Sequence, residues 1–418
     1  MKYSKKERSW ALYDWANSAY TMTVTTTVFP LYFKAAATDM GITASQSTAY
    51  LGFANSIASL LVAVLSPILG TLADYYGFKK RFFMIFLALG VTANLVLGFV
   101  PESQWLMLLF VYIITAIGFS GSNVFYDAFL VDVTEDERMD RVSTYGYALG
   151  YIGSTIPFII AMAIILLSQQ GILPFSGYTT PKIAFVLTAI WWLAFSIPMT
   201  KNVDQKYGIP REKNPIAGSF KRLTVTFKNI KLHKPAFLFL LAYFFYIDGV
   251  DTIIKMATSY GSDLGVSDNM LLIILLVTQF VAFPSAILFG QLADKLKGKT
   301  MLYVAIGIYT LICIYAFFMK TTLDFWVLAI LVGLVQGGIQ AISRSYYAKL
   351  IPKDKSNEFF GFFNIFGKFA AIMGPLLMGY VTYITGKSNY GVLSIVILFI
   401  IGGLILLKVP NDNVQIND

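Results

Sequence analysis

The stretch GTLADYYGFKKR, from Gly70 to Arg81, combines two glycines, one acidic residue and three basic residues directly after a long apolar run. A related stretch, GQLADKLKGK, runs from Gly290 to Lys299 and again follows an apolar run. Glycine suits positions where a chain reverses tightly, and basic residues gather beside membrane spans. The repeat therefore predicts two halves of similar build, each with a tight turn at a membrane face.

The composition supports a membrane location. The chain has 418 residues, of which 57% are hydrophobic and only 13% are charged. Soluble domains carry about 25% charged residues, so a soluble protein of this composition would lack a polar surface. The charges also cluster between apolar runs of about 20 residues, the length of a transmembrane helix. The sequence predicts an all-α membrane protein.

The apolar runs predict twelve transmembrane helices in two six-helix bundles. We expect an N-terminal bundle at residues 1–200, a basic central loop at 201–234 and a C-terminal bundle at 235–418. The expected spans are 9–33, 47–72, 82–100, 104–131, 143–168, 183–200, 236–260, 269–293, 300–319, 322–348, 357–384 and 389–407. Each is long enough to cross a bilayer.

Lysine and arginine predict the orientation. With a cytoplasmic N-terminus, almost all basic residues outside the spans fall on the cytoplasmic side, including the central loop. Only Lys34, Lys182, Lys320 and Lys387 fall on the other side. This asymmetry predicts that both termini are cytoplasmic. The net charge of +9 then reflects topology and nearby anionic lipid, and no nucleic-acid partner is expected.

The sequence offers little for catalysis or metal binding. The single cysteine, Cys313, lies in an apolar segment, and the single histidine, His233, lies in the basic central loop. An intramembrane enzyme would need a nucleophile–base pair or a metal cluster. No glycine-rich lysine loop for nucleotide phosphates is present. We therefore expect neither an enzyme, nor a metal, nor a cofactor.

The repeated turn resembles a hallmark of the major facilitator superfamily. The pattern G-x-L-A-D-x-x-G-basic is given by Gly70, Asp74, Gly77 and the basic residues up to Arg81, between the second and third helices. Its second copy carries Gly290 and Asp294 and is less regular. The resemblance covers the whole chain. It implies the major facilitator fold, with two pseudo-symmetric halves that rock around a central site.

Three further stretches resemble the vacuole effluxer branch of that superfamily. They are WALYDWANSAY (Trp10–Tyr20), FFYIDGVDTI (Phe244–Ile254) and SRSYYAKLIPKDKSNEFFGFFNIFGKFAAIMGP (Ser343–Pro375). The branch includes autophagy-related vacuolar amino-acid exporters and bacterial relatives. The resemblance implies a transporter, favours amino acids as substrates, and implies a cell membrane location in a bacterium or a vacuole-type membrane in a eukaryote.

One motif departs from drug–proton antiporters of the superfamily, which carry G-x-x-x-G-P on the fifth helix. Here that helix reads GYALGYIGSTIP, from Gly146 to Pro157, and lacks the Gly-Pro pair. This difference argues against a multidrug antiporter.

Polar residues inside the spans are the natural site candidates, because an ionisable group in the bilayer is costly unless it faces protein or water. They recur at helical spacing on the first, fourth, seventh, tenth and eleventh helices. The resemblance implies that the first four of these line a common cavity. The candidates for binding substrate or a proton are Asp14, Asn17, Asn123, Asp248, Asp251, Lys255, Gln336, Gln340, Asn364 and Lys368.

Several of these residues have two interpretations. Asp14 could bind substrate or brace a cytoplasmic gate. Asp127 and Arg344 occupy equivalent positions in the two halves with opposite charge, which favours an ion pair in the gate. Asp248 and Asp251 are the strongest site candidates, although Asp251 and Lys255 could simply pair along their helix. Lys368 could bind a substrate carboxylate or neutralise an aspartate.

The turn residues Gly70, Asp74, Gly77 and Arg81 are expected to latch the cytoplasmic side, with Gly290 and Asp294 as a second copy. Partners for Asp74 could be Arg81, Arg138, Arg141 or the N-terminus of the eleventh helix near Ser356 and Asn357.

The leading functional hypothesis is a monomeric secondary transporter of a small polar or zwitterionic, amino-acid-like metabolite. Lacking a suitable histidine, it would couple to a proton through an intramembrane aspartate. A lipid, amphiphile or drug transporter of the same fold is one alternative, and a non-transporting membrane receptor is another.

Overall fold

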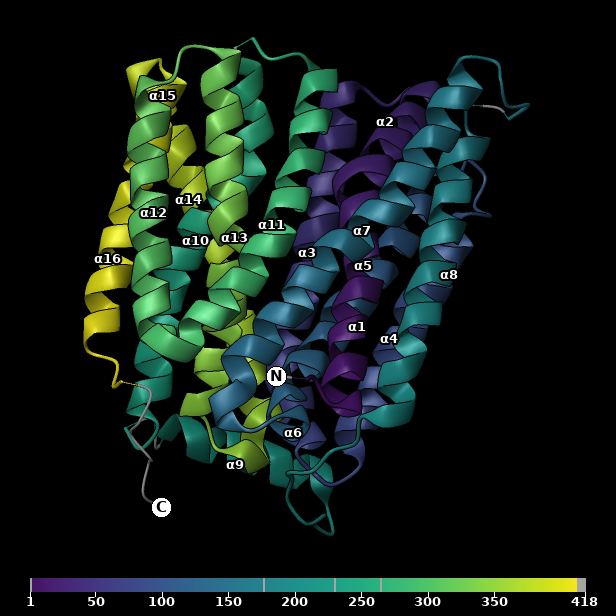
Figure 1. Ribbon diagram of the computed structural model, residues 1–418. Coiled ribbons are helices and arrows are strands. Elements are labelled where there is room, and N and C mark those ends of the chain that lie inside the picture. The colour runs from purple at the N-terminus through teal and green to yellow at the C-terminus, as the bar shows by residue number, and fades with distance from the viewer. Residues whose placement is uncertain (1, 176, 229–230, 264, 412–418) are drawn as a thin grey trace.

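The computed structural model describes residues 2–175, 177–228, 231–263 and 265–411. The described chain is helical, as predicted for an all-α membrane protein (Figure 1). In the first half the elements are α1 (Lys5–Ala19), the π-helical segment η1 (Tyr20–Val28), α2 (Phe29–Asp39), α3 (Ala44–Ala73), α4 (Phe78–Leu97), α5 (Trp105–Ala128), α6 (Leu130–Val133), η2 (Asp136–Arg138), α7 (Met139–Gln169) and α8 (Thr179–Asn202). They are followed by α9 (Pro215–Lys228), α10 (Lys234–Asp263), α11 (Asp268–Leu296), α12 (Gly298–Phe318), α13 (Thr322–Leu350), η3 (Lys353–Lys355), α14 (Ser356–Thr385), α15 (Ser388–Ser394) and α16 (Val396–Leu407).

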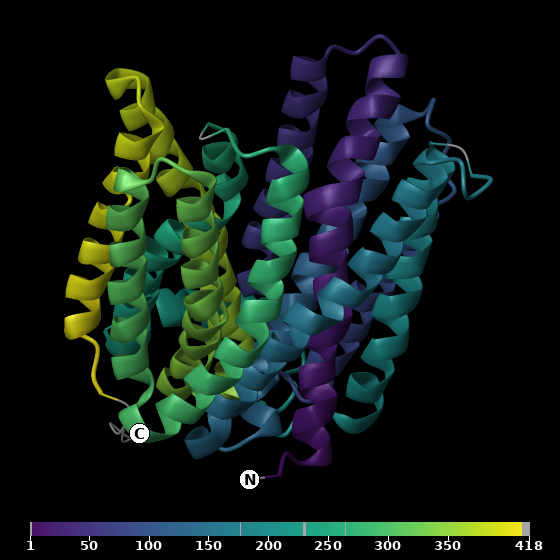
Figure 2. The same cartoon turned by 45° about the horizontal axis from the view of Figure 1, so that its top comes forward.

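Eleven helices in the described chain are long and apolar enough to cross a membrane. They correspond to the second to twelfth predicted spans. The first predicted span, residues 9–33, is divided among α1, η1 and α2, so no single α-helix of it has the required length. Figure 2 shows these three segments continuing one another through the height of the molecule. The first helix is thus present as a column with a π-helical middle.

The helices form two groups side by side, α1–α8 and α10–α16 (Figure 1). Both described ends of the chain lie at the same end of the bundle, which we call the terminal face (Figure 2). The opposite end is called the distal face. Across the boundary between the groups, α3 packs on α14 and α7 packs on α11 and α13. The turn after α3 and the start of α14 both lie at the terminal face.

Glycines allow the helices of the first group to approach closely. Gly118 of α5 lies against Gly90 of α4, so that a Cβ built on Gly118 would stand 2.3 Å from the Gly90 nitrogen. On α7, Gly146 and Gly153 lie against α1 in the same way, facing Asp14 and Trp15. Small residues are the usual means of close packing between membrane helices.

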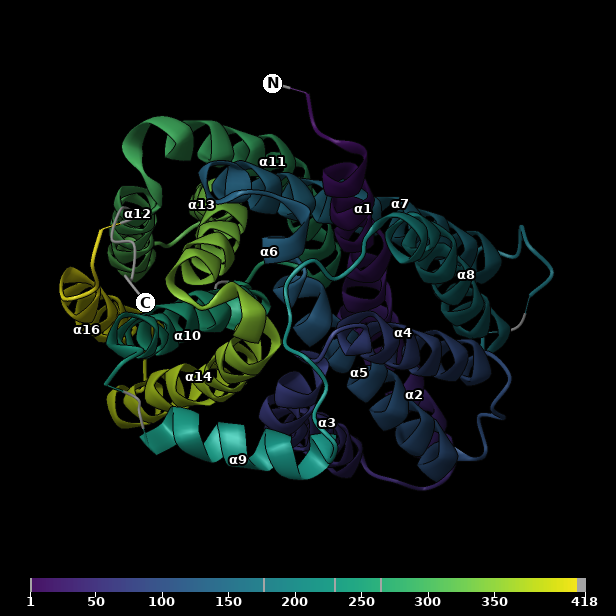
Figure 3. The ribbon, with the colours of Figure 1, turned by 90° about the horizontal axis from the view of Figure 1, so that it is seen from below.

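The segment between the groups is more than the basic loop expected from the sequence. It contains α9, which packs against the terminal end of α3 and crosses beneath α3 and α14 (Figure 3). Upstream of α9, Ile209 pairs with the turn after α3: its N–H donates to the Asp74 carbonyl at 2.9 Å, and its carbonyl accepts from the Tyr76 N–H. The connection is therefore fixed to the turn that defined the repeat.

The contact between Gly118 and Gly90 predicts a clear effect on stability. We expect Gly118→Ala to lower the free energy of unfolding by roughly 1–3 kcal/mol, because the added methyl group meets backbone that must move. Thermal unfolding of the purified protein measures this change. The matched control is Gly307→Ala in α12, where a Cβ meets nothing within 4 Å, so that stability should be unchanged or raised by the better helix former. Equal effects at both positions would contradict the packing argument.

Candidate functional site

The carboxylate of Asp74 binds the N-terminus of α14 across the boundary between the two groups. Its Oδ1 accepts from the backbone N–H and the side-chain amide of Asn357, both at 2.9 Å, and its Oδ2 accepts from the Glu358 N–H at 3.3 Å. Asp74 and Asn357 are fully buried. A carboxylate at a helix N-terminus is stabilised by free N–H groups and by the helix dipole. Of the partners expected for Asp74, the structure selects this one.

The three arginines considered as partners make other contacts. Arg138 binds Glu7 at 2.8 Å, Arg141 faces Asp294, and Arg81 lies over the Phe78 ring. Since none of these three arginines pairs with Asp74, burial has the largest effect on the pKa of its carboxyl. Burial raises the pKa of the Asp74 carboxyl to about 7, and the Asn357 groups that donate to it offset part of the rise.

Two glycines give the turn its shape. A Cβ on Gly70 would lie 2.3 Å from the Asn357 carbonyl oxygen, so only glycine lets α3 touch the first turn of α14. Gly77 has φ +79°, in the left-handed region that favours glycine, and its N–H donates to Gln205 of the connection at 2.8 Å. The sequence pattern therefore reflects one close approach and one reversal of the chain.

The second copy of the turn makes a similar but looser contact. A Cβ on Gly290 would lie 2.0 Å from Thr144 Oγ1 in the first turns of α7, as Gly70 lies against α14. Asp294 faces Arg141 of α7 at 3.5 Å and its side chain is 35% exposed. The two halves thus meet through two related pairs of helices, α3 with α14 and α11 with α7. The carboxylate of the first pair, Asp74, is fully buried, whereas that of the second, Asp294, is partly exposed to solvent.

Additional ion pairs join the groups at the terminal face. Lys79 donates to Asp132 at 2.6 Å within the first group and to the Ser356 hydroxyl of α14 at 2.9 Å. Lys349 of α13 pairs with Asp140 of α7 at 2.6 Å. These contacts close the molecule on this side.

Deeper in the bundle, Arg344 of α13 binds two carboxylates of the other group. Its Nη1 lies 3.0 Å from Asp127 and its Nη2 lies 3.2 Å from Asp14. Its Nε also donates to the Ser143 hydroxyl, and its guanidinium lies over the Trp10 ring at 4.6 Å. The pairing of Asp127 with Arg344 was expected from their equivalent positions. The structure shows that Asp14 also pairs with Arg344. From the sequence, Asp14 could either bind substrate or brace the gate.

A polar cavity of about 210 Å³ lies above this cluster, between the groups. It contains candidates from four helices and both signs of charge, and Lys368 also donates to the Ser120 hydroxyl of α5 at 3.1 Å. The lining residues predicted from sequence are Asn123, Asp127, Asp251, Gln340, Asn364 and Lys368. The structure adds two tyrosines that sequence reasoning missed, Tyr147 of α7 and Tyr243 of α10. Tyrosines are frequent throughout this chain, so periodicity alone gave no signal for these two.

Other candidates lie outside the cavity. Asn17 donates to Asn123 Oδ1 at 2.7 Å and so lies directly behind its wall. Asp248 is fully buried between α10 and α14, where its Oδ1 accepts from the Gly374 N–H at 2.9 Å. Gln336 lines an apolar pocket inside the second group, and Lys255 lines a separate cleft between α3 and α14. In the part of the chain that the structure describes, Asp251 and Lys255 form no ion pair within 4.0 Å.

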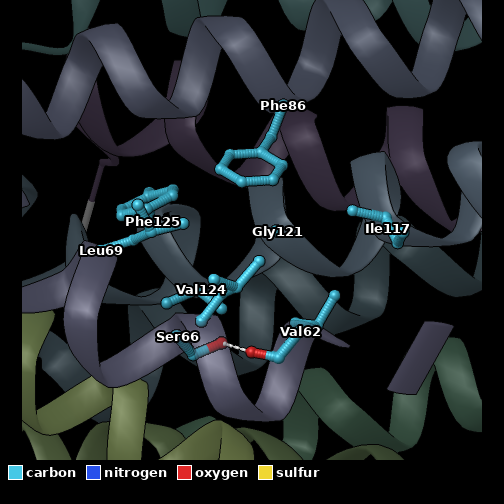
Figure 4. Close-up of a pocket in the computed structure, with 9 residues that line it drawn as sticks. Val62, Ser66, Leu69, Phe86, Ile117, Gly121, Val124 and Phe125 are labelled. Carbon is cyan, nitrogen blue, oxygen red and sulfur yellow. Dashed lines mark hydrogen bonds between the residues drawn. The ribbon is translucent and has the colours of Figure 1, made fainter. Parts of the chain in front are cut away.

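Figure 4 shows a small gap among α3, α4 and α5, lined by Val62, Phe86 and Gly121 and their apolar neighbours. Its volume of about 10 Å³ is at the lower limit for one water molecule, and the hydroxyl of Ser66 is bound to the Val62 carbonyl. The gap is a packing feature of the first group.

Comparison with known proteins identifies the family. Residues 44–416 match the family described as vacuole effluxer Atg22 like. The chain belongs to this family. It is 58% identical over 411 residues to the uncharacterized MFS-type transporter YxiO of Bacillus subtilis (strain 168), covering 98% of this chain and 96% of YxiO. Autophagy-related protein 22 of Saccharomyces cerevisiae (strain ATCC 204508 / S288c) is 25% identical over 401 residues, covering 83% of this chain and 74% of that protein.

The fold agrees with this assignment. The structure of the major facilitator superfamily proton:xylose symporter XylE bound to 6-bromo-6-deoxy-D-glucose superposes with a TM-score of 0.72 at 12% identity, covering 97% of this chain and 96% of that one. The Atg22-like chain is therefore an integral multi-pass membrane protein with the major facilitator fold. It is a secondary transporter and not an enzyme, which confirms the resemblance read from the sequence.

The Asp74 contact predicts how the terminal face opens. We expect Asp74→Asn to increase opening about tenfold, because an amide nitrogen in place of Oδ2 faces the Glu358 N–H, so two donors meet and that hydrogen bond is lost. The readout is the labelling rate of a Gln340→Cys reporter in a Cys313→Ala background, with an impermeant thiol reagent applied at the terminal face. Asp204→Asn is the control, since that carboxylate lies at the same face and is 70% exposed. An unchanged rate in Asp74→Asn would remove the latch role.

The same reporter predicts a pH dependence. The buried carboxyl binds its proton more tightly than an exposed aspartate with the ordinary pKa of 3.8, so the closed state loses stability as pH rises from about 4 to about 7. Divided at each pH by the rate of the same reagent with a free thiol, which removes the effect of the thiolate fraction, labelling should therefore increase between pH 5 and pH 8 in the parent protein. In Asp74→Asn this increase should be lost, whereas a persistent increase would assign the pH dependence to another group.

Proposed function

We propose that this transporter moves a small polar or zwitterionic, amino-acid-like metabolite by alternating access. The observation that carries the proposal is the cavity between the groups, which holds the carboxylate of Asp251 and the ammonium of Lys368 and is closed toward the terminal face. A zwitterion needs both signs of charge. A volume of about 210 Å³ lies below the roughly 300–1,000 Å³ of pockets for drug-sized ligands.

Lys368 and Asp251 suggest how a proton is coupled to the substrate. The two groups interact electrostatically across the cavity. While Asp251 is ionised, it attracts Lys368 and repels an anionic substrate group. A proton on Asp251 removes this competition, so Lys368 can bind the substrate carboxylate. Protonation and substrate binding then favour each other, which is the linkage that a coupled transporter requires.

Asp248 is assigned a different role from Asp251. It is fully buried, it bonds to the backbone of α14, and its Oδ2 has no hydrogen-bond partner within the described residues. Burial of a carboxylate is costly, and the hydrogen bond from the Gly374 N–H offsets part of that cost. Since Asp248 does not line the cavity, we propose that it braces α10 against α14 and that Asp251 exchanges the coupling proton.

The gate is proposed to consist of two layers. At the surface, Asp74 and Gly70 hold α3 to α14, and Gly290 holds α11 to α7. Below them, Arg344 joins α13 to Asp14 and Asp127 of the other group. Opening the terminal face requires both layers to break, and loss of one partner of a buried ion pair costs roughly 3–5 kcal/mol. Water and substrate entering from that face would supply alternative partners.

The family supports the remaining parts of the proposal. The description vacuole effluxer favours transport in the efflux direction. The chain's similarity to YxiO, an MFS-type transporter of a bacterium, supports a cell membrane location. We further propose that a single chain, whose two groups of helices both line the cavity, is the working unit.

The experiment begins with a search for substrate. Each of the twenty amino acids is added singly to the purified protein, the shift of thermal unfolding is recorded, and those that stabilise it are tested as radiolabelled solutes in proteoliposomes under an imposed pH gradient. We expect at least one to be accumulated. Asp251→Asn should bind it with an affinity that no longer falls as pH rises, and should lose gradient-driven accumulation while retaining exchange.

A matched variant separates coupling from folding. Asp204→Asn changes an exposed carboxylate far from the cavity and should behave as the parent protein. If Asp251→Asn keeps gradient-driven accumulation, or if Asp248→Asn loses it while binding and exchange are retained, the assignment of proton coupling to Asp251 is wrong. If no amino acid stabilises the protein or is transported, the substrate class is wrong.

A further inference from the structure

A second cleft lies between α3 and α14, beside the central cavity but on the side of the lipid. Its volume is about 370 Å³. The two helices touch near Gly70 and again where Gly361 meets the Ser66 carbonyl, and they part beyond that point toward the distal face. Three apolar residues on its rim are largely exposed: Leu60 at 56%, Phe369 at 46% and Ile372 at 52%. In a membrane-spanning helix, such residues face acyl chains.

The polar and apolar parts of the cleft lie at different depths. The 30-residue helix α10 is about 45 Å long, enough to cross the bilayer with its polar regions. Lys255 lies eight residues before the last residue of α10, Asp263, or about 12 Å from the distal end. Leu60 follows the start of α3, Ala44, by sixteen residues and so lies about 24 Å from that end. Lys255 thus lies nearest the distal end, whereas Lys368, seventeen residues before the end of α14 and so about 26 Å from that end, lies at about the depth of Leu60.

The polar end of the cleft carries side chains that can donate hydrogen bonds to a ligand. Lys255 is exposed, and across the described residues it forms no hydrogen bond or ion pair. Asn55 of α3 accepts from the Tyr112 hydroxyl at 2.8 Å through Oδ1, which turns its amide nitrogen, a donor, away from Tyr112. Ser56 and Ser59 line the same wall. With Lys368 at its inner end, the cleft carries two ammonium groups.

We propose that this cleft binds an acidic phospholipid of the leaflet at the distal face. The phosphate binds Lys255 with Asn55 and Ser56, and an acyl chain lies over Leu60, Phe369 and Ile372. A phosphate matches an exposed lysine and neutral donors, and the exposed apolar rim matches the chain. The lipid site adjoins the central cavity, since Lys368 lines both, but the phosphate binds at Lys255 and the amino-acid-like substrate occupies the central cavity. Because the lipid lies where α3 and α14 part, it stabilises the state closed at the terminal face.

The test uses the purified full-length protein and palmitoyl lysophosphatidylglycerol as the probe. We expect this lipid to bind, by native mass spectrometry and by a raised unfolding temperature, at least tenfold more tightly than palmitoyl lysophosphatidylcholine. Lys255→Gln should weaken the acidic lipid about tenfold and leave the zwitterionic lipid unchanged, since one charge-assisted contact is lost. Ser59→Phe, which fills the cleft without changing a charge, should weaken the acidic lipid by a similar factor.

Two controls make the outcome decisive. Lys387→Gln removes an exposed lysine outside the cleft and should bind lipid as the parent does, and all variants are first compared for their unfolding temperature without lipid. Glycerol phosphate, the head group without a chain, should not bind measurably. Equal affinity for the two lipids, an unchanged affinity in Lys255→Gln and Ser59→Phe, or tight binding of glycerol phosphate would each overturn the proposal. Amino-acid binding in the central cavity is scored separately and does not decide it.

Discussion

The two groups meet at the terminal face through one buried carboxylate at the start of a helix. Among the described residues Asp74 forms no ion pair within 4.0 Å; it accepts from the free N–H groups of α14, which the close approach at Gly70 brings within reach. A helix N-terminus offers donors that cannot leave their positions, so the contact is directional in a way that a flexible lysine or arginine pair is not. Yet its energy is modest because burial opposes the charge. A contact of this kind suits a joint that must form and break repeatedly.

The layers of contact between the groups differ in depth and in chemistry. At the surface, glycine allows backbone to meet backbone. Deeper, Arg344 joins the groups through two carboxylates and aromatic rings that exclude water. Above this layer the contacts become sparse, and the cavity and the lipid-side cleft begin. The strength of attachment therefore falls from the terminal face toward the distal face, which fits a molecule that opens at one side at a time.

Much of this architecture could be predicted from the sequence, because apolar length, basic asymmetry and the repeated turn are local signals. The pairing of Asp127 with Arg344 followed from equivalent positions in two similar halves. Which polar residues share a cavity could not be predicted as well. Asp248 and Asp251 lie three residues apart on α10, yet one faces α14 and the other faces the cavity. Helical periodicity shows which polar residues share one face of a helix, but not which neighbouring helix that face contacts. For this reason Lys255 and Gln336 were predicted together with the cavity residues, although they do not line the cavity.

The π-helical segment η1 in the first helix separates two parts of one column. Below it, α1 carries Asp14 and Asn17 in register with α5, whereas Thr21 and Thr25 lie within η1 and do not line the cavity. A π-helical turn holds more residues than an α-helical turn. Converting one π-helical turn of η1 into regular α-helix would therefore rotate α2 relative to α1 by one residue's angle, about 100°. A change in η1 would thus let α2 rotate about the helix axis while α1 keeps its position, so that the ion pair between Asp14 and Arg344 stays intact.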